Sequence, residues 1–599
     1  MPKSKNVNIK YTSREFDSIK QDLVDHAKRF YPENYKDFTM PSFGSMVLDS
    51  VSYVGDILSY YVDYAVNESF LDTSVEFNNI RRHARALGYR FKGTPSSFGT
   101  IAFFVLCPAN SEGTAPDLTY LPTIKRGAAL SSDAGGNYVL TEDVVFNDPK
   151  TQFVAARFNS STGATTYFAC KAFGQIQSGI FVATEVDLTN QVFQRFRKIR
   201  IGETTVSEVI SVSDSDGNRY YEVDNLSQEV IFVETTNNDA IADGVRSIMK
   251  PFVTTRKFVV YQDDTGTYLQ FGFGSQDDDS SAIIDPSKVA LKMHGKNTIS
   301  DLSFDPTKLI STNKLGISPY NTKLRVTMRL NEAGKTAAAS NSIKTISDKT
   351  IEFEDLTSLT TAQVNVVESS LECINEDPIG AASTDITNEE LKQRAKAYYA
   401  AQNRAVTKQD YEALVYQMPT KFGAVKRANI VNDPSSTNRM ISLYVISEDN
   451  NGYLASTSQI IKNNIKNYLS HYIPINDSVM IKDSIVVNFG IEFLVMNDRN
   501  YDADSVLFKC QQKLTEYFAE TLYIGEPLYL TLIYELLNDV EGVYDVKRVK
   551  AFNKNGGSYS STNFNFDNAL SKDGTYIKVP KNVILELKFP NSDIKGTVK

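Results

Sequence analysis

The stretch from Asp214 to Arg219 (DSDGNR) contains the residue types of a calcium-binding loop. Carboxylate and amide oxygens at alternate positions are the ligands that Ca²⁺ prefers. Such a loop also requires Gly at its sixth position and Glu at its twelfth, where this chain has Arg219 and Asn225. The pattern therefore predicts a tight Asp-Gly hairpin turn between two strands, without a calcium ion.

The remaining chemistry-bearing residues form no complete site. Phe271–Ser275 (FGFGS) lacks the Lys of a phosphate-binding loop, so a strand kink or hairpin is expected there. The adjacent Asp277, Asp278 and Asp279 would point to alternate faces of a strand, which favours a surface loop. His294 and His471 have no metal-ligand spacing, and no nucleophile elbow occurs. The sequence predicts no catalytic residue, no metal and no cofactor. Its 72 acidic residues leave a catalytic carboxylate pair open, but no spacing selects one.

Length and composition limit the classes of protein to which this chain can belong. A chain of 599 residues should form roughly three to five domains, and 41% hydrophobic with 23% charged residues is typical of folded protein. The net charge of −9 and the absence of basic clusters argue against nucleic acid as a partner. Four dispersed cysteines without a CxxC pair fit a reduced cytosolic protein. The first residues lack an apolar signal core, and apolar runs such as Ile101–Leu106 are too short to span a membrane.

A long amphipathic helix is predicted from Ser42 to about Asn67, and by its rise per residue it would be roughly 35 to 40 Å long. Asp49, Asp56 and Asp63 recur every seven residues and are expected to face solvent. The apolar residues with the alternating three-and-four spacing of a helix seam are Val47, Val51, Val54, Leu58, Tyr61 and Ala65. We call these six residues the seam. It fits either the core of an N-terminal helical domain or the contact surface of an intermolecular bundle.

Capping residues mark the starts of the other helices. The pairs are Thr12 with Glu15, Thr73 with Glu76, Thr387 with Glu390 and Thr407 with Asp410. They predict helices that reach about Phe30 and Leu87, the latter closed by Gly88, and two further helices after Thr387 and Thr407.

The middle of the chain changes to short β-branched and aromatic runs separated by Gly, Pro, Asn and Asp, which predicts strands. These runs are 99–106, 138–146, 166–173, 206–212, 219–223, 229–233, 257–261 and 268–273. Residues 288–363 are rich in Ser, Thr, Lys and Asn and predict further strands with mobile connections and no tight enzyme core. After Thr407, strands at 423–431, 440–447, 479–495 and 543–552 alternate with helices at 457–471, 503–520 and 529–539. The helix-to-strand segments at 411–430 and 534–552 resemble each other and form a possible internal repeat.

Ile379–Pro419 resembles the core of the baseplate J-like proteins of contractile-tailed phages and related injection systems. The residues that match its pattern are Gly380, Asp385, Glu390, Leu391, Arg394, Arg404, Thr407, Asp410 and Tyr411. Leu121–Val144 is similar to the family's other signature, with a longer interval between Pro122 and Gly127. Residues 43–90 look most like the larger wedge subunit of myovirus baseplates.

The resemblance implies a non-enzymatic structural protein of the inner baseplate, located in the virion and assembled in the host cytoplasm. It implies that two copies join a third wedge protein through a helical bundle, and that six wedges form a ring around the central hub. The ring would open with sheath contraction, and a lysozyme-fold adaptor would link it to the sheath. This family favours the intermolecular interpretation of the seam. A β-rich tail protein that binds or depolymerises carbohydrate and an unrelated cytosolic enzyme are the alternatives.

The fold class predicted is multidomain α+β, with an N-terminal helical bundle segment, central mostly β domains and C-terminal small sheets with helices on one face. The expected division is 1–97 helical and wedge-forming, 98–200 β with the J-like strand signature, 201–375 β-rich, 376–435 J-like helical core, 436–555 α+β dimerisation domain, and 556–599 an exposed tail with a terminal strand.

Overall fold

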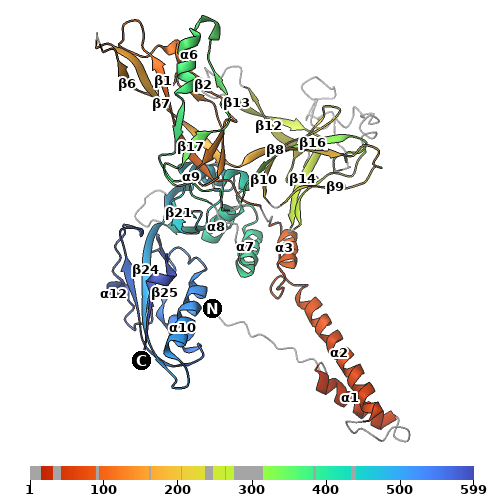
Figure 1. Cartoon of the computed structure of the whole chain (residues 1–599). Coiled ribbons are helices and arrows are strands. Elements are labelled where there is room, and N and C mark those ends of the chain that lie inside the picture. Colours follow the sequence, from red (N-terminus) through yellow and green to blue (C-terminus); the bar gives the residue numbers. More distant parts are fainter. Residues whose placement is uncertain are drawn as a thin grey trace. The chain divides into compact units, whose positions relative to one another are not determined.

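The computed structural model describes the chain in twelve ranges, and the statements below concern these residues. They are 15–30, 42–89, 93–160, 163–203, 205–228, 230–236, 247–263, 265–275, 315–332, 334–381, 386–432 and 440–599. The chain divides into two compact units (Figure 1). The first contains Met1–Arg90 and Ile386–Tyr399, and the second contains Phe91–Asp385 and Ala400–Lys599.

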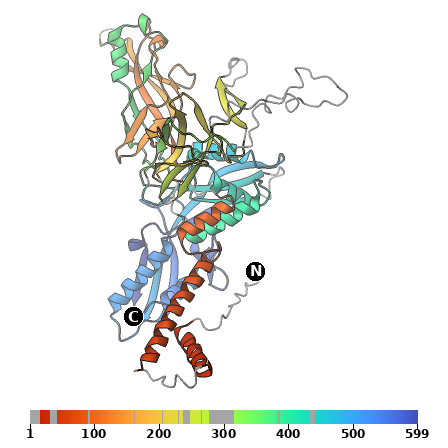
Figure 2. The ribbon, with the colours of Figure 1, turned by 90° about the vertical axis from the view of Figure 1, so that its right-hand side faces the viewer.

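The first unit is helical. Its helices are α1 (Phe16–Phe30), α2 (Phe43–Asn67), α3 (Phe77–Ala86) and most of α7 (Asn388–Ala401). Helix α1 lies alongside α2, and α3 lies alongside α7 (Figure 2). Ile80, Ala84 and Tyr89 pack with Leu391 and Ala395, so a helix from far along the chain completes this small core.

The second unit begins with a seven-stranded antiparallel sheet. Its order is β17-β3-β4-β7-β1-β19, and β6 pairs with β7. The strands are β1 (Phe98–Pro108), β3 (Ala129–Ser132), β4 (Asn137–Leu140), β6 (Gln152–Phe158), β7 (Thr165–Ser178), β17 (Ile343–Ile346) and β19 (Glu372–Ile374). Helix α6 (Thr361–Ser369) and a small sheet of β2 (Thr123–Ile124), β5 (Val144–Val145) and β18 (Ile351–Glu352) accompany it. Its core therefore joins residues 98–178 with residues 337–379.

A second seven-stranded sheet has the order β8-β16-β10-β11-β14-β15-β9. Its strands are β8 (Ile180–Asp187), β9 (Lys198–Gly202), β10 (Val206–Asp214), β11 (Arg219–Glu222), β14 (Lys257–Asp263), β15 (Gly266–Gln270) and β16 (Lys323–Leu330), with the hairpin β12 (Val230–Thr236) and β13 (Ser247–Val253) separate. Leu324 and Val326 of β16 are fully buried. Strand β16 confirms the further strands predicted within 288–363, and the alternation in KLRVTMRL lets it pair with β8 on one side and β10 on the other.

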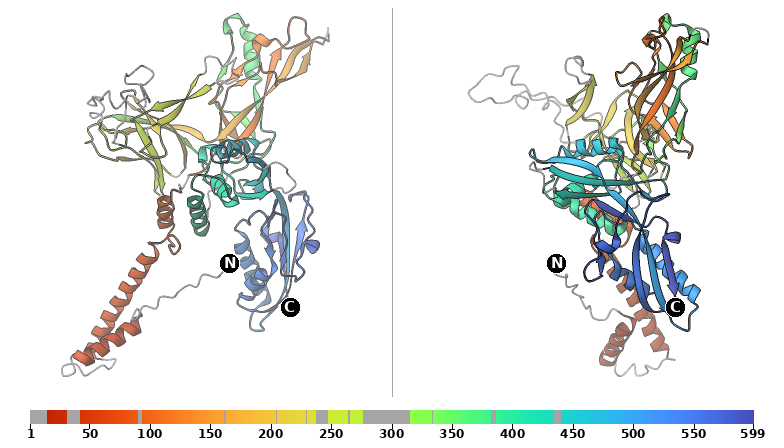
Figure 3. Two further views of the ribbon diagram at one scale, coloured as in Figure 1. Left: turned by 180° about the vertical axis from the view of Figure 1, so that it is seen from behind. Right: turned by 90° about the vertical axis from the view of Figure 1, so that its left-hand side faces the viewer.

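The remaining chain forms small sheets with helices. The first sheet has β20 (Arg427–Asn432), β21 (Met440–Glu448), β22 (Leu454–Ala455) and β23 (Ser478–Asp483), and its helices are α8 (Lys408–Gln417) and α9 (Gln459–Leu469). The second has β24 (Ile485–Asn497), β26 (Val543–Lys554), β28 (Val583–Glu586) and β29 (Ile594–Val598), and a pair is formed by β25 (Leu528–Tyr529) and β27 (Tyr576–Ile577). Helices α10 (Ala503–Phe518) and α11 (Leu530–Asn538) pack on the second sheet (Figure 3), and α12 (Phe566–Ala569) and α13 (Pro590–Asp593) are short.

The α+β class with an N-terminal helical segment is as predicted, and three details differ. The single strand expected at 479–495 is broken at Ser484, whose amide bonds Val445 O and whose hydroxyl bonds Asn582 O, so β23 and β24 enter different sheets. Residues 556–599 are no tail, because β28 and β29 both pair with β24 and bury Ile584 and Ile594. Finally, Glu76 has no capping bond from Thr73, whose hydroxyl donates to Asn67 O. The expected cap at Thr12 lies outside the described residues.

Candidate interaction surface

Helix α2 begins where the sequence predicts. Ser42 is its N-cap, and the Ser42 hydroxyl oxygen accepts a hydrogen bond from the Ser45 amide at 3.1 Å. No proline interrupts the 25 residues that follow, so the helix continues to Asn67. Helix α2 has two faces that could take part in interactions, a polar face and the apolar face that carries the seam.

The face of α2 that lies against α1 is the polar one. Ser45 and Ser52 are buried there, and Lys20 of α1 places its Nζ 2.6 Å from Asp49 Oδ1. A Cβ added at Gly55 would lie 3.4 Å from the Ile19 side chain, so a small residue allows this close approach. The expectation that Asp49, Asp56 and Asp63 face open solvent is therefore corrected, since all three are half-buried. Small serine and glycine side chains let a second helix approach this side.

The seam lies on the opposite face of α2 and is exposed. The exposed fraction rises from 43% at Val47 to 62% at Tyr61, with Val51, Val54 and Leu58 between these values and Ala65 also exposed. Neither α1 nor α3 covers this face in the described chain. The interpretation of the seam as internal core, with residues 11–30 and 73–87 covering it, does not agree with these exposures.

A second exposed stripe on α2 was not predicted. Tyr53, Tyr60 and Tyr64 are 60%, 67% and 41% exposed, and the Tyr60 and Tyr64 rings stack with centroids 6.5 Å apart. Their spacing of seven and four residues places them on one side of the helix. The same spacing can be read from the sequence and could have predicted this stripe. Apolar surface of this extent on a helix is typical of a binding face.

Glu68 joins the end of α2 to the start of α3. Its Oε1 accepts hydrogen bonds from the Val75 amide at 2.8 Å and the Glu76 amide at 3.2 Å, and its Oε2 accepts one from Asn79 Nδ2 at 2.8 Å. Hydrogen bonds from the Val75 amide and the Asn79 side chain lower the pKa of this carboxyl. Glu68 therefore performs the capping that the sequence pattern assigned to Thr73.

The residues of the J-like pattern fall in both units. In the first unit Leu391 is fully buried, and Glu390 Oε1 lies 2.6 Å from Arg394 Nη2, with both side chains mostly buried. The Glu390 amide donates to Thr387 Oγ1 at 3.3 Å, and Arg394 Nη2 donates to Glu390 Oε1. Burial raises the pKa of the neighbouring Tyr89. This half of the motif holds α7 against α3.

The second half of the pattern positions α8. Thr407 and Asp410 form a complete capping box, as the sequence predicts. Tyr411 is buried and donates its hydroxyl to Asp477 Oδ2 at 3.0 Å, and burial is the main reason that its pKa is raised. Arg404 is exposed, and a Cβ at Gly380 would lie 3.1 Å from Ser447 Cβ, so even a methyl group would be crowded there. Asp385 lies outside the described residues. The described residues of the motif act structurally within each unit.

The residues considered above as possible metal or catalytic sites have structural roles where the structure describes them. Asp214 Oδ1 accepts hydrogen bonds from the amides of Asp216 and Asn218 within the β10–β11 hairpin, which confirms the turn predicted there. Asp277–Asp279 and His294 lie outside the described residues, and His471 is exposed after α9. Among the described residues, no group of three His, Cys, Asp or Glu could hold a metal ion. All four cysteines are free and buried. Within the same ranges, no helix has the length and apolar character needed to cross a membrane.

Residues 15–86 match a family model described as the N-terminal domain of bacteriophage baseplate protein. This N-terminal segment is similar to a phage baseplate domain. This domain contains α1, α2 and α3, and therefore the whole seam, and it indicates a structural role in the tail baseplate of a virion.

Other comparisons add little. The cryo-EM baseplate of the anti-feeding prophage, six-fold symmetrised, matches with 8% identity and a TM-score of 0.25, over 95% of this chain and 90% of that chain. The TssK-TssF-TssG baseplate subcomplex of the type VI secretion system matches with 8% identity and a TM-score of 0.25, over 74% of this chain and 96% of that chain. At these TM-scores the likeness supports no conclusion about fold or function. A search among curated proteins finds no match.

Proposed function

We propose that this protein is a wedge subunit of the inner baseplate ring of a contractile phage tail, with a J-like core at Ile379–Pro419. The observation that carries the proposal is the seam on α2. A 25-residue helix with an uncovered apolar face inside a phage baseplate domain has the form of an element that assembles with other helices.

In this proposal the seam contacts α2 of a second copy and a helix of another wedge protein. The stripe of Tyr53, Tyr60 and Tyr64 gives α2 a further surface, so more than one neighbour can pack on it. The C-terminal region, 436–555, forms the second self-contact. Contacts at two ends of a subunit alternate along a chain of copies, and a ring results when the rotation closes.

The proposed ring surrounds the central hub, connects to the sheath through a lysozyme-fold adaptor, and rearranges with sheath contraction. The protein itself carries no catalytic activity in this proposal. Its work is to hold and then release contacts between subunits.

The proposal is tested by sedimentation and light scattering of the purified chain, alone and mixed with the other wedge proteins of its particle. We expect self-association that rises with concentration and a larger complex on mixing. A chain that stays monomeric at high concentration and gains no mass on mixing would overturn it. Electron microscopy of the intact particle then gives the number and place of the copies.

A further inference from the structure

Strand β6 forms the outer edge of the first seven-stranded sheet (Figure 1). Its only partner among the described strands is β7, so one edge of its backbone has no strand beside it. Every residue of β6 is exposed or half-buried, with exposed fractions of 65% at Val154 and 61% at Phe158. Residues 152–156 contain neither a charge nor a proline, the two features that commonly protect such an edge from pairing. This edge is therefore available to a further strand.

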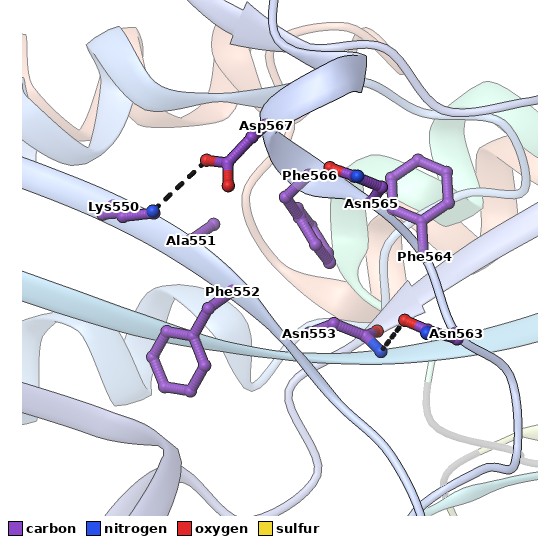
Figure 4. Close-up of a pocket in the computed structure, with 9 residues that line it drawn as sticks. All are labelled: Lys550, Ala551, Phe552, Asn553, Asn563, Phe564, Asn565, Phe566 and Asp567. Atoms are coloured by element: carbon purple, nitrogen blue, oxygen red, sulfur yellow. Dashed lines mark hydrogen bonds and ion pairs between the residues drawn. The ribbon is translucent and has the colours of Figure 1, made fainter.

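The edge of β26 gives a contrast. Strand β26 also has only one partner, but helix α12 lies against its second edge. Lys550 Nζ lies 3.2 Å from Asp567 Oδ1 of that helix, and residues 563–567 line a cavity beside the strand (Figure 4). No described helix or strand other than β7 lies along β6 in this way. The edge of β6 is open, whereas that of β26 is covered.

Two hydrogen bonds show how the backbone of β7 alternates between its neighbours. The Ala109 amide donates to Thr166 O at 2.9 Å, so even-numbered residues of β7 direct their backbone groups toward β1. The Thr141 amide donates to Gln175 O at 2.9 Å, which places the odd-numbered residues on the opposite side, the side of β4 and β6.

This alternation identifies the free groups of β6. Val154 stands opposite the odd-numbered Ala169, so the backbone groups of Val154 face β7. Its neighbours Phe153 and Ala155 consequently direct their N–H and C=O groups away from β7, toward the open edge.

The free groups end on both sides of this short stretch. Before it, the Thr151 amide donates to Asp148 O at 2.9 Å. After it, the Arg157 carbonyl accepts a hydrogen bond from the Thr166 hydroxyl at 3.1 Å. The free groups therefore lie symmetrically, one residue before and one residue after Val154.

We infer that β6 pairs in antiparallel fashion with β6 of a second copy of this chain, about a two-fold axis at Val154. Phe153 of each copy then lies opposite Ala155 of the other, and each of these pairs exchanges two hydrogen bonds. A shift of two residues in either direction would place a free residue opposite Thr151 or Arg157, whose groups are already bonded. A two-fold contact requires a surface that matches itself, and this set of free groups does so, which makes a second copy the occupant.

The side chains agree with this pairing. Val154 meets its counterpart on the outer face of the sheet, where Ala169 of β7 and Leu106 of β1 continue the apolar row. Arg157 comes nearest to Thr151 of the other copy, so no like charges oppose each other across the axis. The contact is short, because a bulge interrupts β6 before Arg157. A short contact is weak, so its test must capture pairs as they form.

The test is disulfide trapping in the full chain, with oxidised glutathione as the oxidant. Val154→Cys places two thiols opposite each other at a Cα separation of about 4.5 Å, which a disulfide can span. Gln152→Cys is the matched control, because residue 152 is exposed on the same face but would lie about 14 Å from its counterpart. The unsubstituted chain, whose four cysteines are buried, gives the baseline.

We expect the Val154→Cys chain to form covalent dimers at least about tenfold faster than the Gln152→Cys chain, with the bond located by mass spectrometry. Equal rates, or no dimer of the Val154→Cys chain above the baseline, would overturn the inference. So would trapping on another baseplate protein with no dimer of this chain. The inference does not depend on the proposed ring, because β6 lies outside both the seam and residues 436–555.

A second substitution tests the hydrogen bonds of the contact. Ala155→Pro, added to the Val154→Cys chain, removes an N–H that faces the second copy and not β7, and it should slow trapping about fivefold or more. Ala155→Gly keeps the N–H and is the matched control. Equal trapping with proline and glycine would show that the backbone of β6 does not make the contact. If the proline variant does not fold, the comparison of Val154→Cys with Gln152→Cys decides.

Discussion

Lys20 Nζ lies 2.6 Å from Asp49 Oδ1, and this ion pair shows that α1 is placed on the polar face of α2. The pair is partly exposed and contributes at most about 1 kcal/mol to stability. Its importance is geometric, because it is on the opposite side of α2 from the seam and leaves that face uncovered.

Leu58→Asp should abolish association through the seam while leaving the fold intact. Leu58 is 58% exposed, so the free energy of unfolding should change by no more than about 0.5 kcal/mol, whereas a buried leucine would lose several times as much. Sedimentation measures assembly and urea unfolding measures stability. Asp56→Ala, on the opposite face, is the control and should assemble normally. Unfolding of the first unit by Leu58→Asp would show that the seam is core.

Glu68→Ala should loosen the connection between α2 and α3, because it removes the acceptor of three hydrogen bonds. Hydrogen-deuterium exchange should speed up at the amides of Val75 and Glu76. The Glu68 carboxyl also makes the stability of the fold depend on pH in the acidic range. Its folded pKa is lowered, so its stabilisation is fully present above the ordinary value of 4.5 and is lost as pH falls through the lower folded value. The thermal unfolding temperature of the Glu68→Ala variant should therefore depend less on pH than that of the unsubstituted chain below pH 4.5. An unchanged acid profile would contradict this role.

Arg394→Ala should destabilise the first unit by about 3 kcal/mol or more, because it leaves the mostly buried Glu390 carboxylate without its partner. Urea unfolding followed by circular dichroism measures the loss. Arg404→Ala is the matched control within the same motif, and since Arg404 is exposed it should change stability by no more than about 0.5 kcal/mol. Equal effects of the two substitutions would refute a structural role for the Glu390–Arg394 pair.

Cys373 and Cys510 should resist thiol reagents in the folded chain. Burial raises the pKa of Cys373 to about 12 and that of Cys510 to about 11, so few thiolates exist near pH 8. Labelling at that pH should be slow in the native chain and fast in urea. Rapid native labelling of either residue, located by mass spectrometry, would show that its site opens.

Local order could be predicted well from the sequence alone. The start and end of α2, the capping box at Thr407 and the Asp-Gly turn at Asp214 depend on residues within a few positions of each other, and all are found as expected. The failure at the start of α3 involves a residue just outside the capping pattern. Thr73 and Glu76 have the capping pattern, yet Glu68 from the preceding helix supplies the bonds.

The sequence by itself determined that α2 is a helix with one polar and one apolar face, since side-chain periodicity sets both. Only the tertiary structure decided which face is covered. Hydrophobic pattern predicts that the apolar face seeks burial, but it contains no information on whether the covering surface belongs to the same chain. Ser45, Ser52 and Gly55 allow α1 to approach the polar side, and the seam from Val47 to Ala65 remains uncovered. The same limit applies to β29, whose place beside β24 depends on pairing across about a hundred residues of chain.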